Sequence, residues 1–369
     1  MPELPGNIGE VTSLNDLPLR DNLRGLTPYG APQLHVPVAL NVNENTHGIP
    51  AEVAQGIVSA LAVAVTTVNR YPDREFTELR DSLSRYLGHG LTRQNIWAAN
   101  GSNEVLQQVL QAFGGPGRSV LGFAPTYSMY SLLASGTGTR WIAGARDAEF
   151  ELSPATAVEW VDRVAPDLVF LCSPNNPTGT PLSLETIAAV YNATDGIVVV
   201  DEAYAEFGPH DEPSALTLLP GRERLLVSRT MSKAFAFAGA RVGYLAADPA
   251  VTDALRLVRL PYHLSALTQA AAVAALAHTP AMLAMVDDIR TQRDRLVNEL
   301  ARLGYAPRRS ASNFVLFGGV EDPRATFEAL LAEGILVRDV GIPGHLRVTA
   351  GTEAETTAFL DALEAIGRP

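Results

Sequence analysis

Between about residue 50 and residue 265 the chain alternates short apolar runs with stretches of helical periodicity. The apolar runs are almost unbroken, which predicts strands that are covered on both faces. These predicted strands span residues 95–99, 119–124, 139–144, 167–172, 196–203, 224–230 and 241–247. Amphipathic stretches between them predict helices, for example over residues 76–88, 103–115 and 183–196. This alternation is typical of an α/β fold with a mostly parallel sheet that is flanked by helices.

The pattern changes on either side of this region. After about residue 265, long helices rich in Ala, Leu and Arg precede short strands and further helices, which predicts a smaller α+β domain. Residues 1 to about 45 contain scattered prolines and show little periodicity. We therefore predict an N-terminal arm over residues 1–45 that joins the small domain, a large domain over 46–265, and a small C-terminal domain over 266–369.

Composition and charge narrow the class of protein. Hydrophobic residues make up 47% and charged residues 18% of the 369 residues, as in an ordinary globular enzyme, and the formal net charge of −12 argues against nucleic acid or an anionic membrane as a partner. The N-terminus shows no secretory signal, and no apolar segment reaches the length of a membrane span. The single cysteine, Cys172, excludes an internal disulfide and fits a cytoplasmic location. No histidine pair has ligand spacing with a carboxylate, so we predict no metal site.

Polar and aromatic residues follow five of the predicted strands. In an open parallel sheet, ligands bind beyond the carboxyl ends of the strands, where loops converge. The segments at these ends are NGSNE (100–104), PTYSMY (125–130), SPNNPTG (173–179), DEAY (201–204) and RTMSK (229–233). We therefore expect these segments to form one shared pocket.

Several of these residues have both a chemical and a structural interpretation. Ser102 and Asn103 open an amphipathic helix whose free N–H groups favour a phosphate, although simple helix capping explains them equally well. Asp201 ends an apolar strand, so its carboxylate needs a cationic partner, either a ligand nitrogen or an internal arginine. Lys233, among apolar neighbours and near Arg241, would lose its proton easily and act as a nucleophile, whereas an ordinary loop lysine is solvated.

Two further residues complete the predicted pocket. Tyr127 is suited either to stacking on a flat ring or to simple packing. Asn176 precedes a proline, and this turn favours a cis peptide bond that directs the Asn176 amide toward the pocket, or else a surface turn. Taken together, the groups describe a ligand with a flat ring, a basic ring nitrogen, a phosphate and an aldehyde. Pyridoxal phosphate has these features.

The chain resembles the fold-type I pyridoxal-phosphate aminotransferases, and within them the histidinol-phosphate aminotransferases. The resemblance rests on motifs that occur in the same order along nearly the whole chain. The motifs that carry the resemblance are LNVNEN (40–45), NRYPD (69–73), AANGSNEVLQQ (98–108), PTYSMY, SPNNPTG, VVVDEAYAEF (198–207), SRTMSKAF (228–235), AGARVGY (238–244) and HLRVTAGT (345–352). The resemblance implies that the large domain binds the cofactor. It also implies an activity in histidine biosynthesis, the transfer of an amino group between L-histidinol phosphate or imidazole acetol phosphate and glutamate or 2-oxoglutarate.

The resemblance also implies a role for each residue at the cofactor. Lys233 would bind the cofactor aldehyde as a Schiff base, and Asp201 would pair with the ring nitrogen. Tyr204 and Asn176 would bind the ring hydroxyl, and Tyr127 would stack on the ring. The residues implied for the phosphate are Ser102, Asn103, Thr230, Ser232 and Arg241.

Substrate and subunit contacts follow from the same resemblance. Arg347 is similar to the arginine that binds the substrate carboxylate with two parallel hydrogen bonds, and Arg338 is similar to a second anion-binding arginine. Tyr71 resembles a tyrosine that reaches over from the neighbouring subunit, which implies a homodimer with shared active sites. The other implied substrate-pocket residues are Tyr29, Asn45, Asn103 and Tyr262.

The sequence departs from the family pattern at two places. Thr46 and His47 stand where the family usually has a proline, and Tyr130 stands where close relatives often carry histidine. Because both places are expected near the substrate end, the alternative is an aromatic amino acid (phenylalanine) aminotransferase on the same scaffold. More distant alternatives are a phosphoamino-acid decarboxylase and a non-catalytic regulator that binds the same cofactor. A nicotinamide dehydrogenase is disfavoured because GTGTRW (136–141) lacks the third glycine of the dinucleotide fingerprint.

Overall fold

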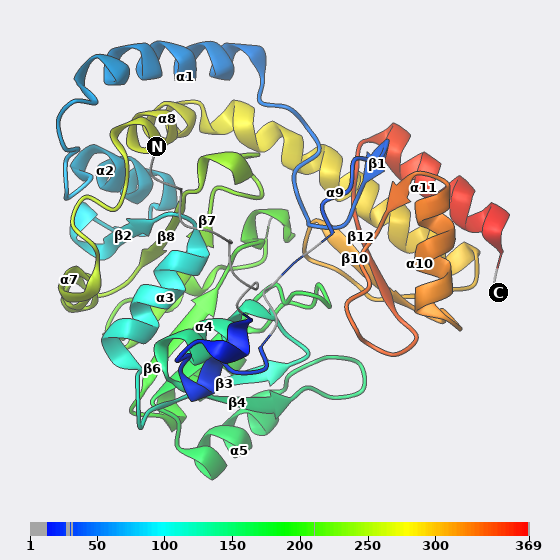
Figure 1. Cartoon of the computed structure of the whole chain (residues 1–369), viewed down its shortest axis with the longest axis horizontal. Coiled ribbons are helices and arrows are strands. Elements are labelled where there is room, and N and C mark those ends of the chain that lie inside the picture. Colours follow the sequence, from blue (N-terminus) through cyan, green and yellow to red (C-terminus); the bar gives the residue numbers. More distant parts are fainter. Residues whose placement is uncertain (1–12, 27–29, 31, 210, 368–369) are drawn as a thin grey trace, which may run out of the picture. The chain divides into compact units, whose positions relative to one another are not determined.

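The computed structural model describes residues 13–26, 30, 32–209 and 211–367 (Figure 1). The chain separates into two compact units, Met1–Gly30 and Ala31–Pro369. The described residues of the first unit include two short 3-10 helices, η1 (Leu14–Asp16) and η2 (Asp21–Leu23). The elements that follow all belong to the second unit.

A mostly parallel sheet forms the centre of the second unit. Within the described residues it contains the seven strands β2 (Ile96–Ala99), β3 (Ser119–Ala124), β4 (Arg140–Ala145), β5 (Leu168–Cys172), β6 (Ile197–Asp201), β7 (Leu225–Thr230) and β8 (Gly243–Ala246). Their order is β2-β8-β7-β6-β5-β3-β4; β8 runs antiparallel to β2 and β7, and the other neighbouring pairs run parallel. Every residue of β2, β5, β7 and β8 is buried, as the unbroken apolar runs predict. The predicted strands and α/β class are confirmed.

The topology brings the carboxyl ends of several strands together. The chain adds β4 on one side of β3 and β5 on the other, so the topological switch point lies between β3 and β5. Asp201 pairs in register with Cys172 on β5 and with Ser228 on β7. On the other side of β7, Gly243 of β8 pairs with Thr230 of β7 and with Ala99 of β2. The loops after β2, β6 and β7 therefore begin at the same edge of the sheet.

Helices pack around this sheet and against one another. They are α1 (Ala51–Ala64), α2 (Thr77–Leu87), α3 (Ser102–Phe113), α4 (Met129–Thr137), α5 (Pro154–Val164), α6 (Leu184–Ala193), α7 (Pro249–Val258) and α8 (Ala266–Ala277). The buried apolar residues of α3 recur at helical spacing and form the apolar face that the sequence predicts; they are Val105, Leu106, Val109 and Leu110. The helix α1 lies along α8 (Figure 1).

The C-terminal part forms a smaller α+β arrangement. Its elements are α9 (Thr279–Arg302), β9 (Ala306–Pro307), β10 (Phe314–Gly318), α10 (Pro323–Ala332), β11 (Ile335–Leu336), β12 (Leu346–Thr349) and α11 (Glu353–Ile366). The strands β12, β10 and β9 form an antiparallel sheet. The strand β1 (Val38–Ala39) pairs parallel with β11, so the chain just before residue 45 contacts this part. The domain boundaries at residues 45 and 265 stay a prediction.

Short 3-10 helices connect several of these elements. They are η3 (Val65–Thr67), η4 (Arg93–Asn95), η5 (Ala205–Phe207), η6 (Ala215–Leu218) and η7 (Ala238–Ala240). In the part of the chain that the structure describes, no single helix is long and apolar enough to cross a bilayer; α8 and α9 pass such a test only as a pair, which bends by 75°. The same part holds no cluster of three His, Cys, Asp or Glu side chains that suits a metal ion.

Candidate active site

Lys233 lies in the loop after β7 and is the only lysine in the chain. Its Nζ donates a hydrogen bond to the carbonyl oxygen of Val42 at 3.0 Å and lies 5.8 Å from the centroid of the Tyr204 ring. Burial of the amine, and then the positive charges of Arg347 and Arg241, lower the pKa of Lys233 to about 7. A large fraction of this amine is therefore neutral and nucleophilic at neutral pH.

Asp201 ends β6 and is buried, with only 3% of its surface exposed. Its Oδ2 accepts a hydrogen bond from the Tyr130 hydroxyl at 2.7 Å, whereas its buried Oδ1 has no hydrogen-bond partner among the described residues. Burial raises the pKa of Asp201 to about 6, and the hydrogen bond from Tyr130 opposes this rise. The carboxylate thus keeps one oxygen for a cationic group, as the sequence predicts for a ring nitrogen.

The structure places Tyr130 beside Asp201, the residue predicted for the cofactor ring nitrogen. Tyr130 occupies the first turn of α4, is fully buried, and binds Asp201. Its ring makes edge contacts with Tyr127 and Phe170, at centroid distances of 5.4 and 5.3 Å. The start of α4 directs this side chain toward Phe170 on β5 and Asp201 on β6.

The segment LNVNEN packs directly against the lysine loop. Asn43 is buried and donates its Nδ2–H to the Tyr204 hydroxyl at 3.0 Å, while its Oδ1 accepts a hydrogen bond from Thr349 at 3.1 Å. Sequence reasoning missed Asn43, although its motif and its left-handed backbone (φ 57°), which asparagine tolerates well, are the available signals. Asn45, a predicted substrate residue, donates to the carbonyl oxygen of Ala234 at 3.3 Å. The structure therefore brings Tyr204, Asn45 and the Lys233 loop together.

The predicted arginines also meet at this site. Arg347 is buried and donates hydrogen bonds to Asn176 Oδ1 at 2.6 Å and to the carbonyl oxygen of Asn41 at 2.7 Å. Arg338 and Arg347 exchange two backbone hydrogen bonds of 2.9 Å, which places their side chains on the same face of this small ladder. The peptide bond between Asn176 and Pro177 is cis, as the turn predicts.

A cradle for an anion forms at the start of α3. Gly101 has φ +87°, and a Cβ at this position would lie 2.3 Å from Arg241 Nη2. A Cβ on Gly243 would lie 2.0 Å from the backbone nitrogen of Ser102. Only glycine permits these approaches, which bring the Arg241 guanidinium and β8 against the first turn of the helix. The free N–H groups and positive dipole end of α3 then favour a phosphate.

The remaining predicted cofactor residues surround this cradle. Thr230 Oγ1 accepts a hydrogen bond from the backbone N–H of Ser232 at 3.1 Å, which fixes the turn before Lys233. The Tyr127 hydroxyl donates to Asn103 Oδ1 at 3.3 Å and so connects the loop after β3 to the start of α3. These four residues lie at or after the ends of β2, β3 and β7, three of the five strand ends from which the sequence predicts the pocket.

Two predicted residues, Tyr71 and Tyr262, are not part of this cluster in the structure. Tyr71 and Tyr262 stack on each other with ring centroids 4.4 Å apart, and 79% and 39% of their surfaces are exposed. Tyr29 lies outside the described residues. The roles of all three stay predictions.

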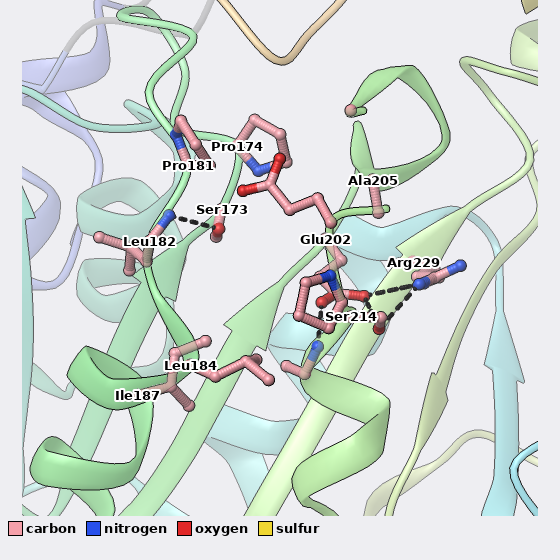
Figure 2. A pocket seen from close by; sticks show the side chains of 14 residues that line it. Ser173, Pro174, Pro181, Leu182, Leu184, Ile187, Glu202, Ala205, Ser214 and Arg229 are labelled. Atoms are coloured by element: carbon pink, nitrogen blue, oxygen red, sulfur yellow. Dashed lines mark hydrogen bonds and ion pairs between the residues drawn. The ribbon is translucent and has the colours of Figure 1, made fainter. Parts of the chain in front are cut away.

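A charged cavity lies behind the strand ends that carry Asp201 and Thr230. Figure 2 shows this cavity, of about 100 Å³, with Glu202, Ser214 and Arg229 in its wall. Arg229 points to the face of β7 opposite Ser228 and Thr230, because side chains alternate along a strand. Its guanidinium donates two hydrogen bonds to Glu202 Oε2, at 2.7 and 3.0 Å, and one to Ser214 Oγ at 2.9 Å.

The same arginine contacts a second carboxylate. Arg229 Nη1 lies 3.4 Å from Glu206 Oε1, which also accepts a hydrogen bond from the Tyr86 hydroxyl at 3.0 Å. Burial opposes the charge on Arg229, but Glu202 and Glu206 outweigh burial and raise its pKa. These charges satisfy one another, so the network joins β6 to β7 beneath the site. Sequence reasoning did not identify it.

Comparison with known proteins places the chain among aminotransferases. Residues 36–363 match the family model described as aminotransferase class I and II. The histidinol-phosphate aminotransferase of Paenarthrobacter aurescens (strain TC1) is 66% identical over 360 residues, which cover 97% of each chain. That of Thermobifida fusca (strain YX) is 55% identical over 351 residues, 95% of this chain and 96% of the relative. The crystal structure of histidinol-phosphate aminotransferase from Sinorhizobium meliloti in complex with pyridoxal-5'-phosphate superposes with a TM-score of 0.85 at 26% identity, covering 95% of this chain and 98% of that one.

Proposed function

The chain belongs to the class I and II aminotransferase family, and we propose that it transfers an amino group between L-histidinol phosphate and 2-oxoglutarate in histidine biosynthesis, with pyridoxal phosphate as its cofactor. The substrate assignment is supported by relatives of 66% and 55% identity that are histidinol-phosphate aminotransferases. The observation that carries the proposal is the position of Lys233: the one lysine of the chain lies beside Tyr204, with a pKa lowered to about 7.

Three features of the structure fit pyridoxal phosphate. Asp201 Oδ1 is a buried oxygen without a partner in the described residues, and it suits the cationic ring nitrogen. The first turn of α3 with Arg241 suits the phosphate. The Lys233 amine suits the aldehyde. When bound, the cofactor supplies a carbonyl that carries the amino group and a protonated ring that accepts electrons from the substrate Cα.

The residues of the chain supply binding and proton transfer. Lys233 Nζ would take the proton from the substrate Cα and deliver it to the carbon of the bound cofactor that receives the amino group, and a pKa of about 7 suits a general base at neutral pH. Asp201 is ionised above about pH 6 and therefore favours the protonated form of a ring nitrogen. Tyr204, held by Asn43, and Asn176, held by Arg347, are the ring-hydroxyl ligands that we propose.

Two arginines are available to bind the anionic groups of the substrates, which carry either two carboxylates or a phosphate. We assign Arg347 to the substrate carboxylate, because a guanidinium binds a carboxylate with two parallel hydrogen bonds. Arg338, on the same face, serves the second carboxylate of glutamate or the phosphate of histidinol phosphate. In the proposed domain division, the large domain (46–265) supplies Lys233, and the small domain (266–369) with the arm supplies both arginines.

A substrate panel tests the proposed function against its alternative. With 2-oxoglutarate as acceptor, we expect kcat/KM for L-histidinol phosphate to exceed that for L-phenylalanine by about 100-fold or more, because phenylalanine leaves an anion-binding arginine unpaired. The comparisons do not favour the aromatic alternative. An equal or higher kcat/KM for phenylalanine would contradict the assignment, and release of carbon dioxide from a phosphoamino acid would indicate a decarboxylase.

We further propose a homodimer, in which Tyr71 of one copy reaches the active site of the other. The segments around Tyr71 and Tyr262 meet through the stack of these two rings, and both segments expose large apolar side chains. The exposed side chains are Val63 (72%), Val65 (54%), Val68 (53%), Leu257 (86%) and Leu260 (74%). Clustered apolar surface of this kind marks protein contacts, and a second copy of the chain is the occupant that a shared active site requires. The cytoplasmic location expected from the sequence stays part of the proposal.

Mixed dimers test this arrangement. We expect the Lys233→Ala and Tyr71→Ala proteins to be impaired separately, and a 1:1 mixture, after unfolding and refolding together, to recover up to about one quarter of the wild-type rate. Half of the dimers are then mixed, and each mixed dimer holds one intact site. Light scattering should give the mass of two chains. A monomeric mass, or a mixture no more active than its parts, would contradict the shared site.

A further inference from the structure

Tyr130 is a buried tyrosine to which the proposed reaction assigns no task. Its side chain is fully buried on α4, between the Tyr127 and Phe170 rings, yet its hydroxyl does not lie in an apolar setting. The hydroxyl donates to Asp201 Oδ2 at 2.7 Å, across 71 residues of sequence. The bond is short and has a carboxylate as acceptor, which places it among the stronger hydrogen bonds of proteins.

This bond determines which oxygen of Asp201 is available. With Oδ2 occupied by Tyr130, the buried Oδ1 is the oxygen without a partner among the described residues. The two oxygens of a carboxylate are equivalent, so a half-turn about its terminal bond changes nothing, but smaller rotations would break the hydrogen bond from Tyr130, because ring contacts keep this donor in one place. The hydroxyl therefore orients the carboxylate as well as binding it.

From this geometry, and resting on the proposed function, we propose that Tyr130 is a positioning residue: it holds Asp201 ionised and oriented, and thereby sets the affinity of the protein for the ring of pyridoxal phosphate. The charged groups around Tyr130 and Asp201 determine whether loss of the Tyr130 hydroxyl raises or lowers the pKa of Asp201. Titratable and charged side chains near Tyr130 and Asp201 come from several elements: Cys172 on β5, Glu202 after β6 and Arg146 after β4.

These neighbours leave Tyr130 as the side chain that favours the ionised form of Asp201. Burial, and then the Asp201 carboxylate, hold the pKa of the Tyr130 phenol well above its usual value, so the hydroxyl stays a donor. Burial and the nearby Asp201 raise the pKa of Cys172 to about 12, so the thiol stays neutral. Glu202 opposes ionisation of Asp201. Loss of the Tyr130 hydroxyl therefore raises the pKa of Asp201 further above 6.

The test compares Tyr130→Phe with a matched control, Tyr244→Phe. Tyr244 is also fully buried, and its hydroxyl has no hydrogen-bond partner among the described residues. The cofactor is removed from each protein, and the Kd for pyridoxal phosphate is measured by titration between pH 6.5 and pH 9. We expect Tyr130→Phe to raise Kd about tenfold or more at pH 7 and Tyr244→Phe to change it by less than about twofold.

The pH dependence distinguishes positioning from simple packing. As the pH rises, Asp201 ionises in the Tyr130→Phe protein too, so its Kd should approach the wild-type value by pH 9. Lys233, with a pKa of about 7, titrates in both proteins and cancels in the ratio of Kd values. A packing defect would give a ratio that does not change with pH, and that result would overturn the inference, as would an unchanged Kd at every pH.

A double-mutant cycle gives a second, independent readout. In the Asp201→Asn protein, Tyr130→Phe should raise Kd by less than about threefold, because the charge through which Tyr130 acts is absent. If Tyr130→Phe raises Kd by the same factor in the wild-type and Asp201→Asn proteins, Tyr130 does not act through Asp201 and the inference is contradicted. A lower melting temperature of the Tyr130→Phe protein would not change this conclusion. If the wild-type protein itself does not bind pyridoxal phosphate, the proposed function fails and the inference fails with it. Binding by the wild type, with no effect of Tyr130→Phe, would refute the inference alone.

Discussion

Replacing Lys233 with alanine should lower the transamination rate by at least about 10⁴-fold and abolish covalent attachment of pyridoxal phosphate. The amine provides both the nucleophile for the cofactor and the base at the substrate Cα, and each function is worth orders of magnitude in rate. No other lysine is present in the chain to take over either task. The rate is measured with L-histidinol phosphate and 2-oxoglutarate, and attachment is measured by mass spectrometry.

Lys233→Arg is the matched control for this variant. It keeps a positive charge near Val42 and Tyr204, but a guanidinium does not lose its proton in the working pH range. We expect it to be as inactive as the alanine variant, while circular dichroism shows an unchanged fold in both. A substantial rate in Lys233→Arg would show that the charge, and not the neutral amine, is what the reaction needs.

The second large effect concerns stability. Arg229→Met should lower the free energy of unfolding by about 3–5 kcal/mol, because it leaves Glu202 and Glu206 buried without their cation. Their side chains expose only 6% and 7% of their surface, so water offers little compensation. The measurement is urea unfolding of the cofactor-free protein at a fixed protein concentration, since ligand and subunit binding both shift apparent stability.

Replacement of a surface arginine is the control for the loss of stability in Arg229→Met. Arg324 pairs with Glu328 one helical turn away, and both side chains are largely exposed, at 73% and 57%. Arg324→Met should change the free energy of unfolding by less than about 0.5 kcal/mol. The deficit of Arg229→Met should also shrink as the pH falls toward 5, because burial raises the pKa of Glu206 and protonation of Glu206 removes an unpaired carboxylate charge. Equal losses for the two variants, or a deficit that grows at low pH, would contradict a buried ion-pair network.

Local patterns in the sequence were sufficient for the fold and for the grouping of several strand-end residues at one edge of the sheet. The apolar runs predicted each central strand, because a strand that is covered on both faces needs an almost continuous apolar sequence. The rule that ligands bind at the carboxyl ends of parallel strands predicts that Asp201, Thr230 and the loop of Lys233 lie at one edge of the sheet. The resemblance added Arg338 and Arg347, whose backbones the structure pairs directly.

What the sequence could not supply are pairings between distant residues. Tyr130 and Asp201 are 71 positions apart, and Asn43 and Tyr204 are 161 positions apart. Periodicity reports which face of its own element a residue occupies, and it carries no information about the residue that it meets on another element. For this reason the sequence does not predict the hydrogen bond between Tyr130 and Asp201.

The ion-pair network was missed for the same reason. Glu202 and Arg229 lie in the motifs VVVDEAYAEF and SRTMSKAF, but their pairing depends on the register between β6 and β7.

Reduction of the cofactor-loaded protein with borohydride, followed by peptide mapping, tests the central claim most directly. Because the chain contains one lysine, only Lys233 and the N-terminal amine can retain a reduced pyridoxyl group. The account predicts one such group per chain, on the peptide that contains Lys233, and its absence when the Lys233→Ala protein is treated in the same way. A wild-type protein that retains no pyridoxyl group, or retains it only at the N-terminal amine, would contradict the account.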